Sequence, residues 1–157
     1  MPNPVVKFQR LSPLATIPKR ATTGAACWDL YPCESAVLLP SLSHRVVRTG
    51  ISIELPPGHV GLLCSRSGLA AGDGVFVLNA PGIIDEDYRG ELKVILAMLP
   101  SNLMWPSLES FEVTPAMRVA QLMVLPKPAL VAIEVEVLSQ TERGNGGLGS
   151  TGITDNA

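Results

Sequence analysis

Short apolar runs with alternating polar positions recur along this chain of 157 residues. The clearest is 131–137, where Val131, Ile133, Val135 and Val137 share one face and two glutamates point away. A period of two predicts a β-strand with one buried face. Other runs of this kind occupy residues 5–8, 36–39, 45–49, 51–55, 59–64, 75–78, 91–99, 111–113 and 119–125.

Fourteen prolines and fourteen glycines separate these runs with turn chemistry. No stretch sustains a helical period for long, and only residues 67–71 predict a short helix, with a serine as N-cap. Many short strands between turns predict an all-β barrel or sandwich, and the length fits one domain.

Charged residues make up only 17% of the chain, and the net charge is -2. The low charged fraction favours an oligomer, because surface that lacks charge is often buried against a partner. The lysines and arginines are scattered along the sequence rather than clustered, which argues against nucleic acid and against a membrane as partners.

The first ten residues do not resemble a signal peptide and no apolar run could span a bilayer, so we expect a soluble, cytoplasmic protein. Three cysteines without CxxC spacing indicate free thiols.

The stretch 79–94 carries the densest candidate chemistry. Pro81 and Gly82 predict a turn, from which the chain returns through two isoleucines as a hairpin. Asp85 follows those isoleucines directly, so we expect partial desolvation, a condition that suits a general base. The alternative from composition is an acidic turn on a solvated loop.

Three further polar islands interrupt apolar surroundings. Arg66 and Ser67 lie at the mouth of the predicted helix, where free N–H groups favour an anion. Arg118 and Gln121 stand three apart at the start of a strand, which predicts opposite faces. Asp29 lies among apolar residues and needs a partner if it is buried.

The chain changes character after residue 138, where five glycines fall between positions 144 and 152. Such a tail buries too little apolar area to order itself. Against simple disorder, Arg143, Ser150 and Thr151 are donors for an anion, and glycines let N–H groups converge on phosphate oxygens.

Taken in order, five segments resemble the five motifs of the trimeric dUTP pyrophosphatase (dUTPase) family: AACWDLYP from Ala25, SRSGLA from Ser65, NAPGIIDEDYRGELKV from Asn79, RVAQL from Arg118 and RGNGGLGSTG from Arg143. The resemblance implies a jelly-roll-like β-barrel over residues 1–138 and a flexible arm over 139–157. It also implies a homotrimer with three sites at subunit interfaces, each closed by the arm of another subunit.

The activity implied by the resemblance is hydrolysis of dUTP to dUMP and pyrophosphate, with Mg2+ on the triphosphate. Such an enzyme limits uracil incorporation into DNA and supplies dUMP for dTMP synthesis. Asp85 would activate the attacking water, whereas family position gives Glu86 and Asp87 no role as a base. The implied nucleoside contacts are Asn79, Gly82, Ile83, Ile84, Tyr88 and Lys93; the implied phosphate contacts are Arg66, Ser67, Gly68, Gln121, Arg143, Gly149, Ser150 and Thr151. Asp29 would meet the metal through water.

Three departures from the family pattern are visible. Leu148 stands where an aromatic ring usually stacks on uracil, Cys27 replaces a glycine, and residues 116–117 replace a Gly-acidic pair. Two alternatives stay open: the related dCTP deaminase class, and a dUTP-binding regulatory switch.

Overall fold

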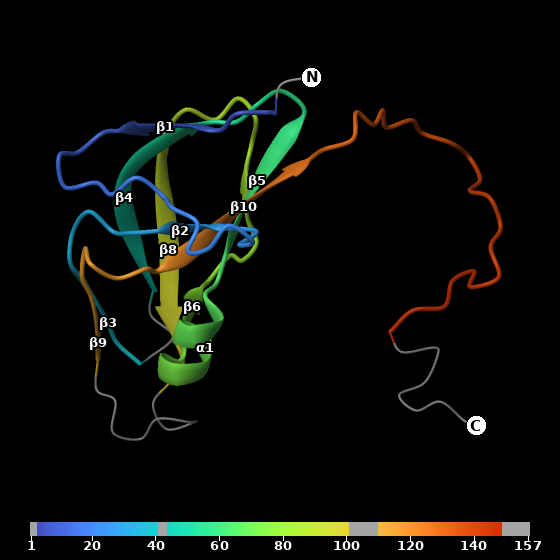
Figure 1. The fold of residues 1–157 in the computed structure, drawn as a ribbon. Helices are drawn as coiled ribbons and strands as arrows, with labels where there is room; N and C mark the ends of the chain where they lie inside the picture. Colours follow the sequence, from blue (N-terminus) through green and yellow to red (C-terminus); the bar gives the residue numbers. More distant parts are fainter. Residues whose placement is uncertain (1–2, 41–43, 101–109, 149–157) are drawn as a thin grey trace.

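The computed structural model describes residues 3–40, 44–100 and 110–148, and nearly all its regular structure is antiparallel β (Figure 1). One four-stranded sheet has the order β1 (Lys7–Arg10), β4 (His44–Glu54), β8 (Glu91–Met98), β6 (Val75–Val77). The other has the order β2 (Trp28–Leu30), β10 (Ala120–Pro126), β5 (His59–Cys64), β7 (Gly82–Ile84). A further pair joins β3 (Ala36–Leu38) to β9 (Phe111–Val113), and α1 (Ser67–Asp73) precedes β6. The predicted all-β, jelly-roll-like class is confirmed.

The core is built from alternate residues of the long strands. Leu92, Val94 and Leu96 of β8 are fully buried, and Val47 and Ile51 of the paired strand β4 meet the same core. Leu63 and Leu122 contribute from the second sheet. Alternation of this kind follows from the period of two along a strand, so the apolar pattern places the core directly.

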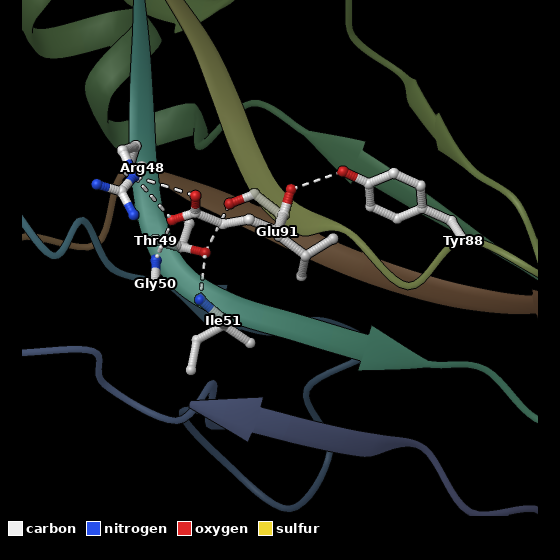
Figure 2. A network of polar contacts seen from close by, with 7 residues as sticks. Arg48, Thr49, Gly50, Ile51, Tyr88 and Glu91 are labelled. Carbon is white, nitrogen blue, oxygen red and sulfur yellow. Dashed lines mark hydrogen bonds and ion pairs between the residues drawn. The ribbon is translucent and has the colours of Figure 1, made fainter. Parts of the chain in front are cut away.

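A bulge joins two strands that the sequence predicts as separate. Residues 45–49 and 51–55 fall mainly in the single strand β4, and its pairing with β8 shifts register between Arg48 and Ser52. At the bulge, the Thr49 hydroxyl donates to the carbonyl of Leu92 at 2.6 Å and accepts from the N–H of Ile51 (Figure 2). These bonds satisfy polar groups that the interrupted ladder would leave unpaired.

Two local expectations are wrong. The turn after β6 does not close a ladder between β6 and β7, because β6 pairs with β8 and β7 pairs with β5 in the other sheet. The N-cap of α1 is Arg66 rather than a serine, with no side-chain cap bond, while the Ser65 hydroxyl accepts from the N–H of Val77.

The segment 131–137 forms no strand, although its pattern is the clearest in the sequence. Val131 is 88% exposed, and the chain after β10 runs away from the barrel in Figure 1. A strand needs a partner edge, and this segment pairs with none in the part of the chain that the structure describes. No helix among the described residues could span a membrane. Cys27, Cys33 and Cys64 are free thiols, as expected.

Gly50 at the bulge is required by both its backbone and its surroundings. Its φ is +66°, and a Cβ there would lie 2.9 Å from the Ala15 Cβ. We expect Gly50→Ala to lower the free energy of unfolding by about 3 kcal/mol, because left-handed strain adds to overpacking. Gly58 also has positive φ, +73°, but a Cβ there meets nothing within 4 Å. Gly58→Ala should therefore lose only about 1 kcal/mol in denaturant unfolding at matched protein concentration. Equal losses would contradict the steric account.

Candidate active site

The buried carboxylate of Asp29 is the centre of a cluster of polar side chains. Asp29 lies in β2 opposite Gln121 of β10 and is only 3% exposed. Gln121 donates from Nε2 to Oδ1 at 3.3 Å, and Arg118 donates from Nη1 to Oδ2 at 3.2 Å. Arg66 adds a second positive charge, with Nε 3.6 Å from Oδ1. The sequence predicts that a buried Asp29 needs a partner, and the structure gives it three.

Arg118 and Gln121 converge on this carboxylate, so the predicted opposite faces are wrong. The strand β10 begins only at Ala120, and Arg118 lies in the preceding turn, where strand alternation does not apply. Its long side chain therefore reaches the same carboxylate as the glutamine.

Arg66 is held at two points beside the start of α1. Its Nη1 donates to the carbonyl of Arg118 at 2.8 Å, and its buried Nε has the Asp29 ion pair but no hydrogen bond. Ser67 and Gly68 follow and are exposed. A Cβ at Gly68 would meet nothing within 4 Å, so nothing inside the chain requires glycine there. The surface beside the Asp29 cluster is therefore open to an anion.

Asn79 and Gly82 pack against one another after β6. A Cβ at Gly82 would lie 3.0 Å from Nδ2 of Asn79 and 3.3 Å from the Cβ of Leu63. Ile84 is buried, whereas Ile83 is 59% exposed on the opposite side of β7. The structure thus brings together an amide side chain and a short strand with one exposed apolar side chain.

Tyr88 is held over Gly90 by a main-chain bond. Its hydroxyl donates to the carbonyl of Glu91 at 2.8 Å (Figure 2), and a Cβ at Gly90 would lie 2.6 Å from that hydroxyl oxygen. The Glu91 carboxylate in turn accepts from Arg48 Nε at 3.0 Å and from the N–H of Gly50 at 2.8 Å. The ring position therefore depends on the register between β4 and β8.

Sequence reasoning missed the structural roles of Arg48 and Glu91, because their partners are more than forty positions away. The only signal in the sequence is that a charged residue, Glu91, begins the apolar strand β8. Lys93 lies on the exposed side of β8, opposite Arg48 in the register.

Asp85 is exposed in the loop after β7, so the expected desolvation is not found within one chain. It leaves the strand directly after the buried Ile84, and no segment among the described residues covers it. Asp85 lines a cavity of about 600 Å³ together with Glu54, Leu55, Pro57, Glu86, Asp87, Arg89 and Lys127.

One chain keeps Asp85 apart from the Asp29 cluster. Ile84 lies opposite Gly61 of β5, and Gln121 lies opposite Cys64, three residues further along the same strand. At roughly 3.3 Å per residue, this separates the two groups by about 10 Å along the strand. Arg143 is exposed on the segment after β10, with Nε donating to the carbonyl of Gly146. Gly149, Ser150 and Thr151 lie outside the described residues.

The family model for dUTPase matches residues 14–152. The chain belongs to the dUTPase family. It is 45% identical over 151 residues to the deoxyuridine 5'-triphosphate nucleotidohydrolase of Dictyoglomus turgidum. The match covers 94% of this chain and 98% of the relative. It is 47% identical over 151 residues to the enzyme of the same name from Corynebacterium glutamicum, with 95% of each chain covered.

Solved dUTPase structures share the fold. The dUTPase of Staphylococcus bacteriophage 80alpha, solved with dUpNHpp, has a TM-score of 0.84 and 28% sequence identity, covering 95% of this chain and 99% of that chain. The chain thus has the fold of the solved dUTPases.

The donor set around Asp29 fits a metal that is held mainly by a triphosphate. Among the described residues, no three His, Cys, Asp or Glu side chains form a metal-binding group. Both Asp29 oxygens already face cationic or amide donors, which disfavours a direct metal bond. Mg2+ keeps several waters and commonly takes phosphate oxygens, so contact with Asp29 through water is compatible with this geometry.

Asp29→Asn should destabilise the dUTPase barrel, because it leaves two arginines without their counter-charge. Breaking a buried pair costs about 3–5 kcal/mol. Since the Arg66 and Arg118 side chains are 22% and 45% exposed, we expect about 2 kcal/mol, measured by denaturant unfolding. Asp87→Asn is the control, because Asp87 is exposed and makes no hydrogen bond or ion pair with the described residues. An Asp29 variant as stable as the Asp87 variant would refute the role of the carboxylate.

Proposed function

We propose that this chain is an Mg2+-dependent enzyme that hydrolyses dUTP to dUMP and pyrophosphate, with Asp85 as the general base. The observation that carries the proposal is the buried Asp29 carboxylate, which gathers Arg66, Arg118 and Gln121 into an anion-binding arrangement. It does so in a chain whose relatives are deoxyuridine 5'-triphosphate nucleotidohydrolases.

In the reaction, Asp85 accepts a proton from water while the water oxygen bonds to the α-phosphorus. The bond from that phosphorus to the bridging oxygen breaks, and pyrophosphate leaves with the bond's electron pair. Phosphoryl transfer depends on positioning and charge neutralisation more than on covalent catalysis, so one base and a set of cationic donors suffice.

The phosphates are held by Arg66, Ser67, Gly68 and Gln121, joined by Arg143 and by the tail at Gly149, Ser150 and Thr151. The open space over Gly68 supports this, because it lets an oxygen approach the backbone. Mg2+ neutralises charge on the triphosphate when bound, and Asp29 meets it through water.

The nucleoside is bound by Asn79, by the backbone of residues 82–84 and by Tyr88, with Lys93 nearby. Uracil presents two carbonyls and one N–H, which a strand backbone can match. The Tyr88 ring packs under the deoxyribose and leaves no room for a 2′-hydroxyl.

The active enzyme is a homotrimer whose sites combine residues of different subunits. The separation of Asp85 from the Asp29 cluster supports this, as does the outward path of the chain after β10 (Figure 1). Apolar side chains along 130–138 are exposed and need cover. Residues 1–138 belong to the barrel of the trimer, with 127–138 packed on another copy, and residues 139–157 form the arm.

The enzyme works in the cytoplasm without nucleic acid or membrane as partners. It limits uracil incorporation into DNA and supplies dUMP for dTMP synthesis. A dCTP deaminase or a regulatory switch is not favoured, because the relatives named above are nucleotidohydrolases.

Asp85→Asn tests the assignment of the base. The amide keeps size and shape but cannot accept the proton, so pyrophosphate release from dUTP should fall by roughly 10²–10⁴-fold. Affinity for a non-hydrolysable dUTP analogue should be retained. Asp87→Asn, two positions further along the same loop, should keep the parental rate, because family position gives Asp87 no role as a base. The parent should release pyrophosphate from dUTP but not from dCTP, dTTP or UTP. Parental turnover by Asp85→Asn would show that another group is the base.

Truncation after Thr141 tests the arm. It removes Arg143 and the glycine N–H groups, and one charge-assisted contact is worth about 1.5–3 kcal/mol, so turnover should fall by roughly 10-fold or more. The barrel should keep its circular dichroism spectrum. Truncation after Gly152 is the matched control, because it keeps the whole glycine-rich motif. If both truncated proteins turn over dUTP equally fast, the arm has no part in the site.

A further inference from the structure

Apart from the bond of the Tyr88 hydroxyl to Glu91 at the start of β8, one side chain joins the loop from Asp85 to Gly90 to the rest of the barrel. Within the part of the chain that the structure describes, Glu86 is the only side chain of this loop with a hydrogen bond or ion pair to a segment outside residues 85–91. Its carboxylate Oε2 accepts from the N–H of Gly58 at 2.9 Å and lies 3.1 Å from Nζ of Lys127.

The loop itself is tied together as a unit. The N–H of Tyr88 donates to the carbonyl of Asp85 at 3.1 Å. The Arg89 guanidinium donates from Nη1 to the carbonyls of Glu86 at 2.7 Å and Tyr88 at 2.9 Å. Because these bonds lie inside the loop, they fix its shape but not its place on the barrel.

Gly58 and Lys127 anchor Glu86 to two other segments. Gly58 lies in the turn between β4 and β5, and Lys127 follows the last residue of β10. These two anchors are themselves bonded, since the N–H of Lys127 donates to the carbonyl of Gly58 at 2.7 Å. The carboxylate therefore meets a framework that is already joined to the second sheet.

We propose that Glu86 is a positioning residue for Asp85: its carboxylate docks the Asp85–Gly90 loop on Gly58 and Lys127, so that Asp85 is held where it meets the attacking water. The inference rests on the proposed role of Asp85 as the base. Glu86 touches neither water nor phosphorus in this account, and it acts through the loop alone.

The charges agree with this role. Asp85, Glu86 and Asp87 are consecutive carboxylates, and their mutual repulsion favours a spread loop. The ammonium of Lys127 offsets the middle charge. The Gly58 N–H and then Lys127 lower the pKa of Glu86, so the docked carboxylate is ionised at neutral pH. Asp87 has no such partner among the described residues, although it is adjacent and lines the same cavity.

The test is a graded series measured by steady-state pyrophosphate release from dUTP and by affinity for dUpNHpp. Glu86→Ala removes both anchors, and misplacement by about 1 Å can cost roughly 10²-fold, so we expect kcat to fall about 10–100-fold. Because Glu86 does not touch the nucleotide, KM and analogue affinity should stay within about twofold. Glu86→Gln keeps an acceptor for the Gly58 N–H and should recover part of kcat. Asp87→Asn should match the parent.

Lys127→Met separates the two anchors. It should lower kcat about as much as Glu86→Gln does. The double variant Glu86→Gln/Lys127→Met should have a kcat no lower than that of the slower single variant, because both substitutions remove the same ion pair. Parental kcat in Glu86→Ala would overturn the inference. An equal loss of kcat in Asp87→Asn would also overturn it. So would a loss of affinity for dUpNHpp as large as the loss of kcat in both Glu86→Ala and Glu86→Gln. Asp85→Asn, assayed in parallel, separates the two claims: if it turns over at the parental rate, the proposed base is wrong whatever the Glu86 series shows.

Discussion

A single buried negative charge, that of Asp29, gathers the side chains that we propose to bind phosphate. Burying an unpaired carboxylate is costly, so the fold must supply donors from other segments. They come from the residue before α1, from the turn before β10 and from β10 itself. Asp29 lies on β2, Gln121 lies on β10 and Arg66 follows β5, so the placement of these side chains depends on the pairing of β10 with β2 and β5 in one sheet.

The nucleoside side depends on sheet register rather than on a charge. Tyr88 is bonded to a main-chain carbonyl, and the carboxylate of that same residue, Glu91, spans the bulge in β4 (Figure 2). A bulge re-aims a strand locally, and here it provides the free N–H that Glu91 binds. The proposed selection at the sugar by Tyr88 would thus be linked to a distortion on a neighbouring strand.

Local pattern predicts the strands but not their partners. Residues 59–64 and 111–113 match β5 and β9 because a period of two is a property of the segment alone. The three-residue strand β2 is too short to show a period, and the assignment of β6 and β7 to different sheets depends on distant pairing. The segment 131–137 has the pattern of a strand but pairs with no strand among residues 3–40, 44–100 and 110–148. In the site, the resemblance to the family motifs pointed to Asp29, Arg66 and Gln121. The anchoring of Glu86 to Gly58 and Lys127 is invisible in sequence, because it spans 28 and 41 positions.

The central proposal is that Asp85 and the arm that serves it come from different copies of the chain, since the described chain after β10 runs away from the barrel (Figure 1). Co-expression of the Asp85→Asn chain with the chain truncated after Thr141, followed by an assay of dUTP hydrolysis, tests this directly. Each variant alone lacks one required group in every site. With random assembly from equal amounts, about a quarter of the sites combine an intact Asp85 with an intact arm from another copy. The account predicts that the mixed trimers recover activity to about that fraction of the parental rate. Activity no greater than the mean of the two separate variants would show that each chain completes its own site.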